Sequence, residues 1–119
     1  MNFEHAADRI SSTLTLGLRT NFVGRADIVN FEWDPRKATR NVRKHGVPFH
    51  EAATIFGDPL AMTFEDPDHS IGERRFITVG MSHAGRLIIV AHADRGEAIR
   101  IISAREASRG ERKHYEEAE

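Results

Sequence analysis

The chain has 119 residues, a net charge of −1 and no cysteine, a composition typical of one small globular domain. The lack of cysteine excludes disulfides and thiolate metal sites, no apolar run is long enough for a membrane span, and 17 basic against 18 acidic residues give no support for nucleic-acid binding by bulk charge. The first residues, MNFEHAADRISSTLTLG, lack the charged-then-apolar pattern of a secretory leader, so we expect a cytoplasmic protein.

Residues 1–29 differ from the rest of the chain. Their apolar residues keep no sustained helical or strand period, and two glycines interrupt them. We therefore expect a weakly structured N-terminal extension, with a short helix near Ala6–Leu14. The compact domain is predicted over residues 30–119 and begins with a short strand at 31–33, which places Phe31 and Trp33 on one face.

Two helices are predicted after this strand. Asp34 and Pro35 suit the N-cap and the first helical position, and Gly46 suits the residue just past the end. Ala38 and Val42 should face inward, which leaves a basic exposed side. The second helix, about 48–56, has an apolar stripe at i, i+3, i+4 and i+7, formed by Phe49, Ala52, Ala53 and Phe56.

Four strands and a last helix follow. Alternation in LAMTF predicts that Leu60, Met62 and Phe64 share a buried face. Further strands are predicted at 74–82, 86–93 and 98–104, and the short turns between them favour an antiparallel meander. For the C-terminal helix, Ser108 with Glu111 and Ser103 with Glu106 are competing capping boxes.

The predicted fold class is therefore α+β. It comprises a four-stranded antiparallel meander plus a short N-terminal strand, two N-terminal helices and a C-terminal helix. We expect the helices to pack on one face of the sheet.

Several polar residues admit two interpretations. If the alternation of strand 74–82 extends back to Glu73, then Glu73 and Arg75 share a face. The pair could be a proton-transfer group beside a phosphate-binding arginine. It could equally be a surface ion pair. Lys44 and His45 end the first helix, where cations either stabilise the helix dipole or contact a phosphate. The strand arginines Arg100 and Arg105 carry the same ambiguity.

The sequence predicts no metal site and no cofactor. The seven histidines show no metal-ligand spacing. A glycine-rich phosphate loop and a G-x-S-x-G element are both absent.

Three blocks, KHGVPF, HSIGERR and RIISAR, occur in order at suitable spacing. With the segments around them, from Phe31 to about Glu117, they closely resemble the BrnT family of bacterial toxins. The resemblance implies a RelE-like fold and a toxin of a type II toxin–antitoxin pair. It also implies a metal-independent endoribonuclease that needs no cofactor, and a ribbon-helix-helix antitoxin of the BrnA type. That antitoxin binds DNA, so the toxin itself would meet DNA only indirectly.

The resemblance also implies roles for particular residues. Such an enzyme deprotonates the RNA 2′-OH, stabilises charge on the phosphoryl oxygens and protonates the leaving 5′-oxygen. Arg75 and Arg105 are expected as clamps for the phosphate and transition state, and Glu73 or His45 as the proton-transfer group. A helix C-terminus favours charged histidine, which favours acid over base. Residues expected to bind RNA phosphates are Lys44, Arg40 and Arg100.

Two alternatives remain at this point. A catalytically inactive relative would act only as an antitoxin-binding module or transcriptional co-repressor, and its expression would not arrest growth. A DNA-binding regulator acting alone is less favoured, because no helix-turn-helix is evident and the net charge is slightly acidic.

Overall fold

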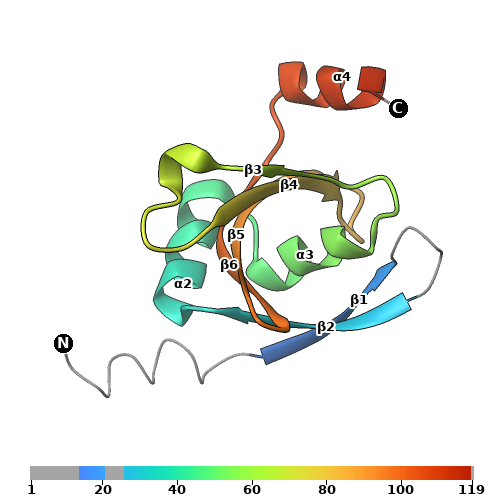
Figure 1. Cartoon of the computed structure of the whole chain (residues 1–119). Helices are drawn as coiled ribbons and strands as arrows, with labels where there is room; N and C mark the ends of the chain where they lie inside the picture. The colour runs from blue at the N-terminus through green and yellow to red at the C-terminus, as the bar shows by residue number, and fades with distance from the viewer. Residues whose placement is uncertain (1–13, 21–25, 119) are drawn as a thin grey trace.

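The structure is a computed structural model that describes residues 14–20 and 26–118. The described residues form one six-stranded sheet, in the order β1-β2-β6-β5-β4-β3, and three α-helices (Figure 1). This confirms the α+β class. The strands are β1 (Leu14–Thr20), β2 (Ala26–Trp33), β3 (Met62–Glu65), β4 (Arg75–Met81), β5 (Leu87–Arg95) and β6 (Ala98–Glu106). The helices are α2 (Pro35–His45), α3 (Phe49–Thr54) and α4 (Arg109–Ala118), with 3₁₀ turns η1 (Ile55–Gly57) and η2 (Pro67–His69).

The predicted antiparallel meander is confirmed in strands β3 to β6. The N-terminal strand is longer than predicted, because β2 begins at Ala26 and pairs in parallel with β6. Strand β1 pairs antiparallel with β2, so two strands occupy a segment predicted to be weakly structured. The helix expected near Ala6–Leu14 lies outside the described residues, apart from Leu14, which begins β1. The division of the chain at residue 30 stays a prediction.

Helix α2 has the predicted ends. The Asp34 carboxylate accepts a hydrogen bond from the Arg36 amide (2.9 Å), and Gly46 adopts a left-handed φ of 70°. The predicted inward face is only partly right. Ala38 packs against the core, but Val42 is 46% exposed and Asn41 is buried in its place.

The main core lies between α3 and one face of the sheet. All four residues of the predicted stripe on α3 and η1 are buried. Phe56 contacts Phe31 on β2 with ring centroids 5.4 Å apart, and Phe49 meets Trp33 edge-on at 5.9 Å. The apolar period of this helix was thus sufficient to identify the side that packs on the sheet.

Helix α4 lies over the opposite face, so the expectation that all helices share one face is wrong (Figure 1). Its first turn is a capping box, in which the Ser108 amide donates to Glu111 (2.9 Å) and the Glu111 amide donates to Ser108 (3.2 Å). The helix covers only part of that face. Phe64, predicted to be buried, is therefore 53% exposed. Leu60, also predicted to be buried, is 56% exposed because it lies in the turn before β3 and not on the strand. Among the described helices, none has both the length and the apolarity to span a membrane.

Candidate functional site

Arg75 and Arg100 lie on the same face of the sheet, on either side of Ala93. The register pairs Ala93 of β5 with Arg75 of β4 and with Arg100 of β6, and side chains of directly paired residues share a face. We call this the outer face, because α3 packs on the other one. Its residues are Met62 and Phe64, Arg75, Ile77 and Val79, Ile89, Ala91 and Ala93, and Arg100, Ser103 and Arg105.

Glu73 joins the two arginines. Its carboxylate accepts a hydrogen bond from the Arg100 guanidinium, and its Oε1 lies 3.5 Å from Arg75 Nε. All three side chains are roughly two-thirds to three-quarters buried. Within the described residues, the Nε atoms of Arg75 and Arg100 are buried and donate no hydrogen bond. The Glu73–Arg75–Arg100 cluster therefore combines a proton acceptor with two cations that retain donor capacity.

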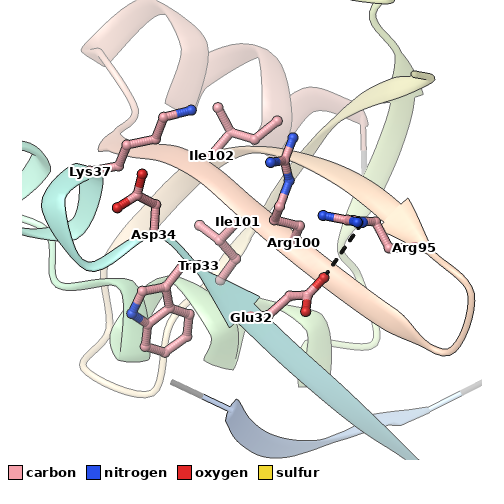
Figure 2. Close-up of a pocket in the computed structure, with 8 residues that line it drawn as sticks. All are labelled: Glu32, Trp33, Asp34, Lys37, Arg95, Arg100, Ile101 and Ile102. Atoms are coloured by element: carbon pink, nitrogen blue, oxygen red, sulfur yellow. Dashed lines mark ion pairs between the residues drawn. The ribbon is translucent and has the colours of Figure 1, made fainter. Parts of the chain in front are cut away.

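A second carboxylate lies across β6 from this cluster. Glu32 of β2 pairs with Arg100 in the parallel register and is only 9% exposed. Its Oε1 is 3.8 Å from Arg95 Nε, and both side chains line a small pocket with Arg100 (Figure 2). Arg100 thus lines this pocket beside Glu32, while its guanidinium is bonded to Glu73.

Helix α2 adds a further cation to the cluster. Burial, together with the positive charges of Arg100, Arg75 and Arg40, lowers the pKa of the Lys37 ammonium, and Asp34 opposes this shift. Figure 2 shows Lys37 and Arg100 pointing to the same side from α2 and β6. Burial is the larger cause, but the contributions of Arg100, Arg75 and Arg40 show that several positive charges act on this place, where an anion would be stabilised.

A groove of about 260 Å³ continues from Lys37 along α2. It is lined by Lys37, Arg40, Asn41, Lys44, His45, Ile102 and Ser103. It shares Lys37 and Ile102 with the pocket at Arg100. The predicted residues Arg40, Lys44 and His45 therefore line one groove, and that groove adjoins the cluster at Arg100.

Arg105 lies in a different groove, under α4. Its guanidinium donates two hydrogen bonds to Glu111, at 2.7 and 2.8 Å. This pairing raises the pKa of Arg105 and, with the hydrogen bonds from Ser108, lowers that of Glu111 to about 2. Arg100 and Arg105 share the outer face only because a bulge in β6 falls between them. In a regular strand, an odd spacing of five would put them on opposite faces.

Sequence reasoning missed Glu32, Lys37 and Arg95. One signal was present for Glu32, because alternation in 31–33 already placed it opposite Phe31 and Trp33. Its partner Arg100 could not be inferred, since the β2–β6 pairing joins segments far apart in the chain. Among the described residues, no group of three or more histidine, aspartate or glutamate side chains is arranged to hold a metal ion.

Comparison with known proteins identifies the family. The family model described as "Ribonuclease toxin, BrnT, of type II toxin-antitoxin system" matches residues 33–111, which include the whole Glu73–Arg75–Arg100 cluster but not Glu32. The chain belongs to the BrnT family. This confirms the predicted family and its place in type II toxin–antitoxin systems.

A solved BrnT structure agrees with this assignment. The 1.1 Å crystal structure of the Brucella abortus ribonuclease toxin BrnT is 25% identical in sequence and superposes with a TM-score of 0.51. The match covers 64% of this chain and 92% of that one. No curated protein sequence matches the chain significantly. The BrnT fold and the ribonuclease-toxin class are thus supported at the level of the family.

Proposed function

We propose that this BrnT-family chain cleaves RNA through the ribose 2′-OH, with the Glu73–Arg75–Arg100 cluster as its catalytic centre. The observation that carries the proposal is the position of the Glu73 carboxylate between two arginines of one sheet face. Both arginine side chains keep about a quarter to a third of their surface exposed. A phosphodiester offers further acceptor oxygens to their guanidinium groups.

The reaction follows from these groups. The phosphoryl oxygens of RNA bind Arg75 and Arg100 and compete with Glu73 for their donors, which frees a carboxylate oxygen. Glu73 then takes the 2′-OH proton as the 2′-oxygen attacks phosphorus, and the arginines stabilise the charge that develops on the phosphoryl oxygens. The bond to the 5′-oxygen breaks, and the products are a 2′,3′-cyclic phosphate and a 5′-OH. Because the nucleophile belongs to the RNA, the scheme requires no metal ion.

His45 is the proposed proton donor to the 5′-oxygen. It lies at the end of α2, in the groove that continues from Lys37 past Arg40 and Lys44. Lys37, Lys44 and Arg40 would hold the phosphates next to the cleaved bond. Arg105 stays a predicted second clamp for the phosphate and transition state.

The proposed physiological partner is a cognate antitoxin. The family description places BrnT proteins in type II toxin–antitoxin systems, and the resemblance implies a ribbon-helix-helix antitoxin of the BrnA type. With a net charge of −1, the chain is expected to reach DNA only through that antitoxin. We also expect it to act in the cytoplasm.

The test compares Arg75→Ala with Arg74→Ala in the full chain, on single-stranded RNA with EDTA present. Both changes remove one arginine charge, but Arg74 is 74% exposed and pairs with Glu65 away from the cluster. We expect the wild type and Arg74→Ala to leave 2′,3′-cyclic phosphate ends, and Arg75→Ala to be slower by about 10²–10³-fold. Equal losses in both variants would contradict a specific role for Arg75.

An inactive wild type would point elsewhere. If it cleaves neither free nor ribosome-bound RNA and its expression leaves growth unchanged, the chain is an antitoxin-binding module. Cooperative melting of Arg75→Ala at the wild-type temperature is the control that separates loss of chemistry from loss of fold.

A further inference from the structure

A large groove lies between the outer face of the sheet and helix α4. Its volume is about 600 Å³. Strands β3 to β5 contribute apolar side chains to it, and charged or polar groups lie only at its β6 and α4 side. The lining residues are Met62, Phe64, Ile77, Val79, Ile89, Arg105, Gly110, Glu111, His114 and Tyr115.

The apolar wall of this groove is left open in the isolated chain. Phe64 is 53% exposed, and Ile77, Val79 and Ile89 are only partly buried. An exposed aromatic ring on an apolar sheet face is a surface suited to a flat, partly apolar ligand. Phe64 pairs with Ile77, so it stands beside Ile77 at the edge-strand side of this wall.

The groove is continuous with the proposed catalytic centre. On β4, Arg75 comes two residues before Ile77 on the same face, and Phe64 is the cross-strand neighbour of Ile77. From strand geometry, Phe64 therefore lies about 8 Å from Arg75 at the backbone. One nucleotide bridges such a gap, with its phosphate at Arg75 and its base at Phe64.

We propose that this groove binds a nucleobase of single-stranded RNA, with Phe64 as the stacking platform, next to the phosphate held by Arg75 and Arg100. The inference rests on the proposed function and extends it to base binding. Cations at both ends, Arg75 at one and Arg105 at the other, fit a polymer in which phosphates alternate with flat rings. An apolar protein segment would instead have to desolvate Arg105 and its partner Glu111.

The experiment measures binding of two fluorescent probes to the full chain. One is a 2′-O-methyl oligoribonucleotide, which lacks the nucleophile and is not cleaved. The other is an abasic 2′-O-methyl oligomer of equal length, which keeps the phosphates and lacks the bases. The variants are Phe64→Ala, Phe64→Trp and the control Leu60→Ala, whose side chain is equally exposed and lies outside the groove.

We expect Phe64→Ala to weaken binding of the base-containing probe about tenfold, since loss of one stacked base has an effect of this order. Phe64→Trp should restore it and Leu60→Ala should leave it unchanged. All three variants should bind the abasic probe like the wild type. Because Phe64 is half-exposed, its replacement should not shift the melting temperature by more than a few degrees.

The following results would overturn the inference. Wild-type affinity of Phe64→Ala for the base-containing probe, or equal weakening with both probes, would show that the groove holds no base. A change in oligomeric state or antitoxin binding with unchanged RNA binding would make it a protein interface. If Arg75→Ala binds neither probe while Phe64→Ala binds both like the wild type, the base site is contradicted and the proposed catalytic centre is not. If the wild type binds neither probe, the proposed function fails and the base site fails with it.

Discussion

Asn41 of helix α2 bonds both backbone polar groups of Ala104 on strand β6. Its Nδ2 donates to the Ala104 carbonyl (2.7 Å) and to the Val47 carbonyl (3.0 Å), and its Oδ1 accepts from the Ala104 amide (3.1 Å). Strand β2 pairs with β6 only as far as Ile101, so the edge of β6 is free beyond that point. One buried side chain thus replaces the missing strand and attaches the basic helix to the sheet.

Asn41→Ala should therefore destabilise the protein by about 2–3 kcal/mol, because it leaves the buried amide and carbonyl of Ala104 without partners. The measurement is the midpoint of urea unfolding. Thr39→Ala is the control, since Thr39 lies on the exposed side of the same helix. Equal stabilities for the two variants would contradict the role given to Asn41.

Glu51 of α3 is the centre of a second buried network. Its carboxylate accepts two hydrogen bonds from Arg86 (2.9 and 2.6 Å) and one from Ser82 (2.7 Å). Arg86 also donates to the Gly46 carbonyl at the end of α2 (3.1 Å). The hydrogen bonds from Arg86 lower the pKa of Glu51 from its ordinary 4.5 to about 2, with Ser82 adding to the effect and burial opposing it.

This shift predicts a pH dependence of stability. A carboxyl group whose pKa is lowered by folding stabilises the protein above pH 4.5, and that stabilisation is lost as the pH falls towards 2. For Glu51 it amounts to at most about 3 kcal/mol. Between pH 5 and 2, the free energy of unfolding should fall more steeply in the wild type than in Glu51→Gln. Parallel curves would show that Glu51 does not carry the effect.

The sequence predicted local features better than faces and neighbours. Helix α2 was found correctly because Asp34, Pro35 and Gly46 act on the backbone beside them. Alternation correctly placed Arg75 and Ile77 on one face, but it could not show which face would be covered. Phe64 was consequently expected to be buried.

The candidate site was harder still to foresee. Glu73 and Arg75 lie close in sequence and do meet, although β4 begins at Arg75 and the expected extension of the strand back to Glu73 is not present. Arg100 joins them through strand register, and Glu32 joins through a parallel pairing of distant segments. Arg105 shares the outer face because of a bulge at Ile102. No local sequence pattern predicted this bulge. Sequence periodicity shows which residues of one strand share a face. A site built from several strands depends on strand pairings, which periodicity does not encode.

Lys37 provides a test of the convergent positive potential. Replacing it with methionine should weaken RNA binding and reduce the slope of log K against log salt by about 0.7, the value for one phosphate contact on a single strand. The control is Lys113→Met on α4, which removes the same charge from an exposed position outside both grooves. The measurement is a salt titration with the 2′-O-methyl probe. An unchanged slope for Lys37→Met would remove Lys37 from the RNA path.

Glu111 tests whether Arg105 takes part in binding. Its carboxylate engages the Arg105 guanidinium twice and, with a pKa of about 2, stays charged at neutral pH. Glu111→Gln removes that charge but keeps an acceptor for the Ser108 amide, so the capping box of α4 should survive. If Arg105 is a phosphate clamp, the variant should bind the 2′-O-methyl probe about three- to tenfold more tightly than the wild type. Adding Arg105→Ala should abolish the gain, and Glu116→Gln on the same helix should produce none. An affinity for Glu111→Gln equal to that of the wild type would mean that Arg105 serves only to hold α4 against the sheet.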